Sequence, residues 1–547
     1  MPSEASYDLT RSPWLSVRMQ DGTEGEMSLR EVIEHAASVR RLVGDVPTQE
    51  FALLRMLLAI VHDALQGPRD IDDWNDLWNE GLPTKKITDY LDEHRHRFDL
   101  LHPTEPFLQC PDLDVAGGPR SLDCLVADVP NGNPFFTMRA EGVSRLSFAE
   151  AARWLVHAHA FDTSGIKSGA KNDPRTKGGK VYPLGVAWAG NLGGVLIEGD
   201  TLQETLLLNL IAFDTDNLRQ DPDRDLPAWR HPPTGPRELG AVELSRRPAG
   251  VRDLYTWQSR RVRLTHDGDG VTGVILAYGD PLHPRNMHQR EPMTGWRRSP
   301  AQEKKLGLAQ VYLPQEHDPS RSAWRGLGAL IAGIAPGSEQ RGEAAAIVRP
   351  RILDWAARLS VEGDLPSEFL IRARLIGAVY GTQQSVIDEI IDDAVAMPIV
   401  LLHQSHRDLG QAAIDAVADA EASVSVLGDF ATDLARASGA EPEPAKETVR
   451  HRAFATLDGP FRRWLADLRP AHSPREVRAA WQRQARDIIL RLGDEALRSA
   501  GDAAWEGRVI RTKSGGDLWL NASRADRVFR ARLAKALPLA AVDSADD

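Results

Sequence analysis

The sequence predicts an α+β protein with two domains: a large mixed α/β domain over residues 1–362 and an all-α helical bundle over residues 363–547. A length of 547 residues is typical of two or three domains. Helix-like and strand-like hydrophobic patterns alternate before about residue 320, whereas nearly every later segment has helical spacing. The stretch VEGDLPSEF carries the Gly and Pro of a linker and marks the boundary near Gly363.

The first elements are a hairpin and two helices. WLSVRM reads as a strand, and Asp21-Gly22 is a hairpin turn signal. Ser28 and Glu31 then form a capping box for a helix, because the serine accepts from the first helical amides and the glutamate reaches back. The next helix, about residues 48–65, places six apolar side chains on one face: Leu53, Leu54, Leu57, Leu58, Val61 and Leu65.

A second capping box precedes a region of changing period. Ser147 and Glu150 begin the helix AEAARWLVHAHAF, and residues 180–200 read as two strands joined at Asn191–Gly194. TLQETLLLNLIAFD is again helical. Residues 214–236 are rich in Asp and Pro and predict a long surface excursion. From about residue 240 to 315 the pattern favours strands.

The last third is predicted to be helical. Five long helices are expected over residues 369–380, 386–403, 408–437, 447–468 and 473–499, followed by one more that ends near residue 536. The third of these is acidic (Asp408, Asp415, Asp419, Glu421, Asp429, Asp433), and the fifth is basic (Arg475, Arg478, Arg483, Arg486, Arg491, Arg498). Complementary faces within a bundle explain this best, and a basic face on nucleic acid is the alternative.

Composition narrows the class of protein. The formal net charge of −12 argues against nucleic-acid binding over the whole surface, although it permits a local basic groove. No apolar run approaches the roughly 20 residues of a membrane span, and the first residues, MPSEASYDLTRSPW, contain no secretory signal. Two cysteines cannot form a disulfide scaffold, which suits a reducing cytoplasm. We therefore expect a cytoplasmic protein that does not contact a membrane.

No catalytic or metal-binding pattern stands out. Cys110 and Cys124 lie too far apart for a zinc pair, and His94 and His96 would point to different faces of a helix. The sequence contains neither G-x-S-x-G nor H-E-x-x-H. We therefore expect no enzyme activity, no metal and no cofactor.

The stretch DTSGIKSGAKNDPRTKGGK, Asp162–Lys180, is a basic, glycine-spaced loop in this acidic chain. It is no Walker loop, since neither Lys171 nor Lys180 is followed by a hydroxyl residue and the loop runs from a helix to a strand. The interpretation that is left is a contact with a polymer: the backbone amides and lysines of the loop would bind its phosphates or its groove. A disordered surface loop is the equal alternative.

Two further loops carry residues suited to nucleic acid. ADVPNGNPFFTM, residues 127–138, sets Phe135 and Phe136 beside asparagines, which suits stacking on unpaired bases. A turn whose phenylalanines return to the core is the simpler interpretation. Gln383 and Gln384 stand at a predicted helix start, where glutamine contacts base edges or merely caps the helix.

Several stretches together resemble one family. YDLTRSPWLSV, SLREVIEHA, FDLLHPTEPFLQ, AARWLVHAHAFDTSGIKSG, LPAWR and GVRDLYTWQSRRVRL are similar to the CasA family, the large subunit of the type I-E CRISPR surveillance complex Cascade. The resemblance runs from about Tyr7 to about Leu490, and GVRDLYTWQSRRVRL and FDLLHPTEPFLQ are its most specific parts. It implies a mixed α/β domain followed by a helical bundle, and a binding subunit without catalytic residues.

The resemblance also implies sites for DNA. The loop that approaches the protospacer-adjacent motif (PAM) matches Ser164, Gly165, Ile166, Lys167, Ser168 and Gly169, with Lys171 just beyond it. The glutamine wedge that enters the duplex beside the PAM matches Gln383 and Gln384. A family lysine of the minor groove has no clear match; Arg285, Arg290, Arg297 and Arg298 are possible basic groove contacts.

For RNA, the resemblance implies that Val129, Pro130, Asn131, Gly132 and Asn133 hold the 5′ handle of the guide RNA. The implied partners are this RNA, double-stranded target DNA, the other Cascade subunits and the helicase-nuclease effector. A stand-alone metal-dependent nuclease and a purely structural scaffold subunit are the alternatives. Within the basic loop, we expect residues 164–169 to lie on DNA and AKNDPRTKGGK to be poorly ordered without it.

Overall fold

The computed structural model describes residues 6–127, 142–331, 346–511 and 515–541 of the chain. Its contacts divide the chain into two compact units, each built from several segments. Unit 1 comprises Met1–Ser320, Gly333–Leu365 and Arg372–Ala394. Unit 2 comprises Arg321–Ala332, Pro366–Ile371 and Val395–Asp547. The fold is mixed α+β with a helical C-terminal region, as the sequence predicts.

Unit 1 contains a long helix that is buried along almost its whole length. The predicted helix forms as α2 (Pro47–Leu65), and burial extends beyond the predicted apolar face, since every residue from Thr48 to Ala64 is buried. Its buried Arg55 makes a bidentate pair with Glu291 at 2.8 and 2.9 Å, which satisfies the charge inside the core. The other helices of unit 1 are α1 (Leu29–Glu34), α3 (Ile71–Glu80), α4 (Thr84–Glu93), α5 (Phe148–Phe161), α6 (Leu202–Leu208), α7 (Ala241–Arg246), α8 (Val251–Tyr255), α9 (Pro300–Leu306) and α11 (Arg351–Val361).

The strands of unit 1 form small sheets. The orders are β2-β1-β3, β10-β9-β11 and β13-β12-β6, and β4–β5 and β7–β8 form separate pairs. Their bounds are β1 (Leu15–Met19), β2 (Glu24–Met27), β3 (Val39–Leu42), β4 (Lys167–Ser168), β5 (Lys180–Val181), β6 (Gly194–Glu198), β7 (Arg260–His266), β8 (Val271–Tyr278), β9 (Trp296–Arg298), β10 (Tyr312–Pro314), β11 (Ile347–Val348), β12 (Leu370–Tyr380) and β13 (Ile387–Pro398, which ends in unit 2).

Local sequence signals account for several of these elements. Both predicted capping boxes form, at Ser28 for α1 and at Ser147 for α5. The β1–β2 hairpin turns through Gly22 at a φ of 88°, in the left-handed region that glycine adopts without strain. The strand-rich pattern predicted for about residues 240–315 is confirmed in part: β7, β8, β9 and β10 lie in this range, but so do the helices α7, α8 and α9.

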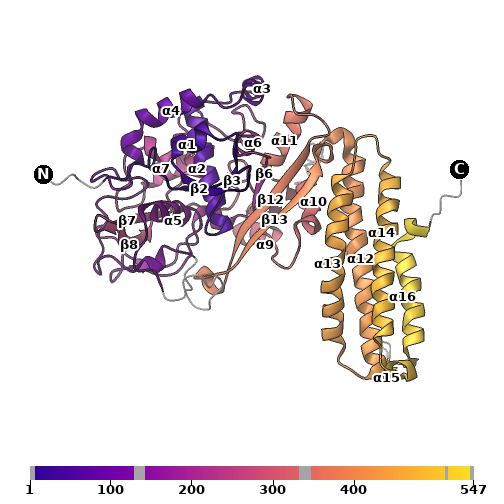
Figure 1. The fold of residues 1–547 in the computed structure, drawn as a ribbon. Coiled ribbons are helices and arrows are strands. Elements are labelled where there is room, and N and C mark those ends of the chain that lie inside the picture. The colour runs from indigo at the N-terminus through magenta and orange to yellow at the C-terminus, as the bar shows by residue number, and fades with distance from the viewer. Residues whose placement is uncertain (1–5, 128–141, 332–345, 512–514, 542–547) are drawn as a thin grey trace. The chain divides into compact units, whose positions relative to one another are not determined.

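Two predicted helices are strands. Residues 370–380 and 387–398 form β12 and β13, which lie side by side as two long arrows in Figure 1. β12 pairs antiparallel with β6, with Arg374 opposite Leu196. The backbone of β12 is thus satisfied by a distant segment, and the helical prediction for 369–380 and 386–403 is wrong.

The segment predicted to be a surface excursion is partly core. Asp225 and Trp229 are buried, and the Asp225 carboxylate accepts from the amides of Arg252 and Asp253 at 3.0 and 2.7 Å. The Arg252 guanidinium, itself fully buried, pairs with Asp63 of α2 at 2.8 Å. The segment 214–236 therefore supplies Asp225, which holds the backbone around the buried Arg252 charge; composition alone does not reveal this role.

Unit 2 is a helical bundle with a small appended hairpin. The helices α12 (Arg407–Ser438), α13 (Pro442–Ala466), α14 (Pro474–Arg498) and α16 (Ala522–Ala536) lie alongside one another (Figure 1). Shorter elements are α10 (Leu327–Ile331), α15 (Asp502–Glu506), β14 (Arg508–Arg511) and β15 (Asp517–Leu520). The bundle helices agree with the prediction, whereas the β14–β15 hairpin was not predicted.

The complementary charges of α12 and α14 meet inside the bundle. Arg478 of α14 contacts Asp415 at 2.6 Å and Asp419 at 2.8 Å on α12. The Asp419 carboxylate is nearly buried and also accepts from the Gln482 amide at 2.9 Å. At this position the acidic residues of α12 form ion pairs with a basic residue of α14. This agrees with the interpretation that the two charged faces complement each other within the bundle.

Candidate nucleic-acid interface

The predicted DNA loop, Ser164–Gly169, begins where α5 ends. Its first residues are held by two side chains of the β7–β8 hairpin: the Arg260 guanidinium donates to the carbonyls of Asp162 and Thr163, and the Tyr278 hydroxyl donates to the Gly165 carbonyl at 2.7 Å. Gly165 has a φ of 120°, which a residue with a Cβ rarely adopts. The backbone path of the loop is therefore fixed by the side chains of Arg260 and Tyr278, and it requires a glycine at residue 165.

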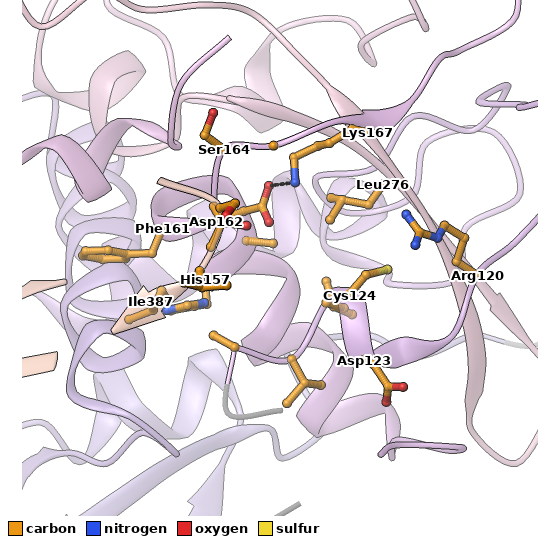
Figure 2. Close-up of a pocket in the computed structure, with 18 of the residues that line it drawn as sticks. Arg120, Asp123, Cys124, His157, Phe161, Asp162, Ser164, Lys167, Leu276 and Ile387 are labelled. Carbon is orange, nitrogen blue, oxygen red and sulfur yellow. Dashed lines mark ion pairs between the residues drawn. The ribbon is translucent and has the colours of Figure 1, made fainter. Parts of the chain in front are cut away.

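A buried ion cluster supports the loop. The Lys167 ammonium lies 2.7 Å from the Asp162 carboxylate (Figure 2). The same carboxylate also pairs with Arg260. Burial opposes ionisation of Asp162, but Lys167 and Arg260 outweigh it and hold the pKa of the carboxyl below its usual value. Only 9% of Lys167 is exposed, so its side chain stabilises the loop from inside. The resemblance marks Lys167 as a DNA contact, whereas its position indicates a supporting role.

The glutamine pair and the DNA loop are joined directly. Gln383 and Gln384 form an exposed 3₁₀ turn, Thr382–Gln384, between β12 and β13, so the predicted helix start at this position is wrong. The Gln384 carbonyl accepts from the Ser164 amide at 2.8 Å. At the base of the hairpin, the Tyr380 hydroxyl donates to the Phe161 carbonyl at 2.6 Å. Segments about 220 residues apart in the chain thus form one surface feature.

Both glutamines have unusual backbone conformations. Their φ values are 56° and 55°, in the left-handed region that costs about 1–3 kcal/mol for a residue other than glycine. Glycine or asparagine would adopt this turn with less strain. Strain of this kind is found most often where the side chains serve a function, which draws attention to the exposed amides of Gln383 and Gln384.

A cavity of about 490 Å³ opens between these segments. In Figure 2 the Asp162–Lys167 pair lies at the upper centre, His157 and Phe161 of α5 lie to the left, and Arg120, Asp123 and Cys124 lie to the right. Ser385, Val386 and Ile387 of the glutamine hairpin complete its lining. The cavity therefore joins the DNA loop, the glutamine turn and residues 120–127, the last described residues before the predicted RNA-handle segment.

The basic extension of the loop is partly anchored. Lys171 pairs with the exposed Asp114. Arg175 is held by Asp173 at 2.8 Å, by Glu238 at 3.0 Å and by the carbonyls of Tyr278 and Gly279. The expectation that residues 170–180 are a free, poorly ordered extension is therefore wrong for the Asp173–Arg175 part. Lys177 and Lys180, at the tip, are exposed.

The remaining predicted contacts are scattered or not described. Val129, Pro130, Asn131, Gly132 and Asn133, predicted to hold the RNA handle, lie outside the described residues, as do Phe135 and Phe136. Arg290 donates to the Pro248 carbonyl, and Arg298 pairs with Glu303 at 2.7 Å. Arg285 and Arg297 are exposed and pair with no described acidic residue, so they fit a groove contact better than the other two.

The described residues offer little for catalysis. Among them no group of three or more His, Cys, Asp or Glu could hold a metal ion. Cys110 is buried, and burial raises the pKa of its thiol to about 12, which disfavours the nucleophilic thiolate. His157 and His159, both in α5, are buried, and His157 lies 2.9 Å from the Thr48 hydroxyl. Within the same ranges no helix is long and apolar enough to cross a membrane.

The roles of Asp162 and Arg260 in positioning the loop were not predicted from the sequence. Asp162 lies within the basic stretch, whose lysines and arginines carry the predicted DNA contacts. Arg260 lies in RRVRL, one of the stretches that carry the family resemblance. A lone acid at the end of an apolar helix, followed by a basic loop, was the available signal for a buried pair.

Comparison with known proteins shows to which family the chain is related. The family model of CRISPR-associated protein Cse1 matches residues 8–492. Cse1 of Thermobifida fusca is 63% identical, with a TM-score of 0.90 over 98% of this chain and 99% of that one. The CasA/Cse1 protein of Thermus thermophilus is 29% identical over 92% of this chain and 93% of its own.

A chain of a solved CRISPR RNA-guided surveillance complex shares the fold, with a TM-score of 0.69 at 19% identity over 97% of this chain and 99% of that one. The relationship expected from the sequence motifs is confirmed by the family match and by the 63% identical structure. The chain therefore belongs to the Cse1 family of CRISPR-associated proteins, also called CasA.

Proposed function

We propose that this chain is a non-catalytic, nucleic-acid-binding subunit of Cascade that recognises the PAM in double-stranded target DNA and helps to open the duplex. The observation that carries the proposal is the hydrogen bond of 2.8 Å from the Ser164 amide to the Gln384 carbonyl. It places a glycine-containing loop beside an exposed, strained glutamine turn. Groove contact and strand separation would then occur at adjoining points of one surface.

The chemistry of the loop suits the minor groove. That groove mainly distinguishes A·T from G·C pairs, so a protein that reads it accepts several short sequences. Backbone next to Gly165 can approach base edges closely, and Tyr278, Arg260 and Asp162 hold it in place from inside. A fixed backbone loses little entropy on binding, which favours recognition by a few contacts.

The glutamine turn suits the first step of opening. One base step of stacking costs on the order of 1–2 kcal/mol, and later pairing of guide RNA with the target roughly replaces the DNA pairing that is lost. Gln383 and Gln384 need only hold the first pair apart until the RNA engages. A turn fixed at both ends, by Ser164 and by Tyr380, resists being pushed aside by the duplex.

The wider role follows from family membership. We infer that the chain assembles with guide RNA and the other Cascade subunits, because a chain of the RNA-guided surveillance complex has the same fold. Residues 129–133 are the proposed contact with the 5′ handle of the RNA. The assembled surface would recruit the helicase-nuclease effector during antiviral defence in the cytoplasm.

The test removes the glutamine side chains without disturbing the turn. Gln383→Gly with Gln384→Gly keeps the left-handed backbone, because glycine adopts it readily. In the assembled complex, this variant should bind a PAM-containing duplex about tenfold more weakly, which corresponds to one base step of stacking. A target whose first pairs beside the PAM are mismatched should restore binding.

The matched control is Gln383→Asn with Gln384→Asn, which keeps a shorter amide and should retain part of the duplex affinity. Unchanged duplex binding by the glycine variant would favour the purely structural scaffold. The stand-alone nuclease is tested by incubating pure protein with labelled DNA or RNA and Mg²⁺ or Mn²⁺. Metal-dependent cleavage that survives stringent purification would overturn the non-catalytic proposal.

A further inference from the structure

The outward face of the β4–β5 pair carries an unusual set of side chains. Lys167 pairs with Val181 and Ser168 with Lys180, so side chains alternate between two faces. On the inward face, Lys167 and Val181 are 9% and 3% exposed. By the same alternation, Ile166 and Tyr182 share the outward face with Lys180, and 56% and 66% of these two residues are exposed. An aliphatic and an aromatic side chain therefore stand together in solvent.

Two lysines extend this face. Lys177 and Lys180 lie directly opposite each other across the tight turn Gly178-Gly179, and each accepts a backbone hydrogen bond from the other. The turn needs its glycines, whose φ values are 57° and 75°. Like charges opposed in this way are destabilising. Neither ammonium forms an ion pair with any described residue, although Lys171 and Arg175 of the same loop do.

The outward face adjoins the glutamine turn. Ile166 follows Ser164 by two residues, and the Ser164 amide is bonded to Gln384. Between them, a Cβ on Gly165 would lie 3.7 Å from the Cβ of Ser385, so the loop backbone contacts the glutamine hairpin. Any strand parted at Gln383 and Gln384 would emerge beside this face.

We propose that this face, formed by Ile166, Lys177, Lys180 and Tyr182, is a stacking platform for single-stranded DNA. An unpaired base from the opened duplex stacks on the Tyr182 ring beside Ile166, and Lys177 and Lys180 hold the neighbouring phosphates. An exposed aromatic next to unpaired lysines is the combination that binds single strands without regard to sequence. The inference rests on the proposed function, since it assigns to this surface the strand that the glutamine turn releases.

The experiment compares Tyr182→Ala with Tyr182→Phe in the assembled complex, on a PAM-containing target that carries 2-aminopurine beside the PAM. The alanine variant should bind roughly 5- to 100-fold more weakly, the effect of losing one base–aromatic stack. Its 2-aminopurine fluorescence in the bound state should be brighter, because the base is no longer stacked. The phenylalanine variant should match the wild type in both measurements.

A second variant tests the lysines. Lys177→Gln with Lys180→Gln should reduce the slope of log K against log salt concentration by about 0.7 for each lost phosphate contact. The control is Val242→Ala, an equally exposed apolar residue on α7. It should change neither affinity nor slope.

Three outcomes would overturn the inference. If Tyr182→Ala matches the wild type while the glutamine variants lose duplex binding, the proposed function stands and the platform is wrong. If Tyr182→Ala prevents assembly of the complex, as seen by native mass spectrometry, the face binds a protein subunit instead. If the wild-type complex shows no PAM dependence, the proposed function fails and this inference fails with it.

Discussion

At the scale of single residues, buried charges decide how the loop Ser164–Gly169 is held. Asp162 is the C-cap residue of α5, and its carboxylate forms ion pairs with Lys167 and Arg260. One carboxylate thus fixes the start of the loop to the β7–β8 hairpin. Its depressed pKa means that the carboxylate stays ionised throughout the neutral range. The exposed lysines at the tip of the loop, in contrast, remain free to meet an anion.

Replacing this carboxylate should loosen the loop. Asp162→Asn leaves Lys167 and Arg260 buried without their counter-charge, which should lower the free energy of unfolding by about 3–5 kcal/mol. Urea unfolding measures the loss, and faster amide exchange at residues 163–169 should accompany it. The control, Asp114→Asn, removes only an exposed partner of Lys171 and should leave stability unchanged within error. Equal effects of the two substitutions would refute the supporting role of Asp162.

At the scale of elements, pairing with a distant segment overrides local preference. LIRARLIGAVY contains the Leu, Ala and Arg that favour helices, and its polar–apolar alternation is confined to the five residues Ile371–Leu375. It becomes a strand because β6 lies beside it, and both faces of its middle part are covered. In unit 2 the segments α12, α13 and α14 pair with no strand among the described residues, and they keep the helical form that their periodicity predicts.

The bundle gives a test of its own internal charge pairing. Arg478→Ala leaves the nearly buried Asp419 with Gln482 as its remaining hydrogen-bond donor, which should cost about 1–3 kcal/mol. Urea unfolding followed by circular dichroism at 222 nm measures the change. Arg475→Ala, one turn earlier on the exposed surface of α14, is the matched control and should have no effect. A stable Arg478→Ala protein would mean that this pair does not contribute to holding α12 to α14.

At the scale of the whole molecule, unit 1 buries three histidines in their neutral form. Burial lowers the pKa of His62 and His157 to about 3 and that of His159 to about 4. In the unfolded chain these histidines have a pKa near 6.5, so below that pH the unfolded chain binds more protons than the folded protein. The stability due to these histidines is complete above about pH 6.5 and is lost as the pH falls.

The free energy of unfolding should therefore decline between pH 6.5 and pH 4.5, by up to about 1.4 kcal/mol per pH unit for each buried histidine. Urea titrations across this range measure the slope. His157→Gln, which keeps a polar partner for Thr48, should make the slope shallower. His283→Gln, on an exposed residue, should leave it unchanged. A free energy of unfolding independent of pH over this range would contradict the assignment.

The sequence by itself determined the family, the capping boxes of α1 and α5, the strand character of residues 260–278 and the main bundle helices. These features depend on contacts between residues that are close in the sequence, or on motifs that can be recognised in the sequence directly. It did not determine that β12 and β13 are strands, that Lys167 faces inward, or that Gln384 accepts from Ser164. Those depend on segments up to about 220 residues apart, because a hydrogen bond or a buried charge selects its partner only after the chain has folded.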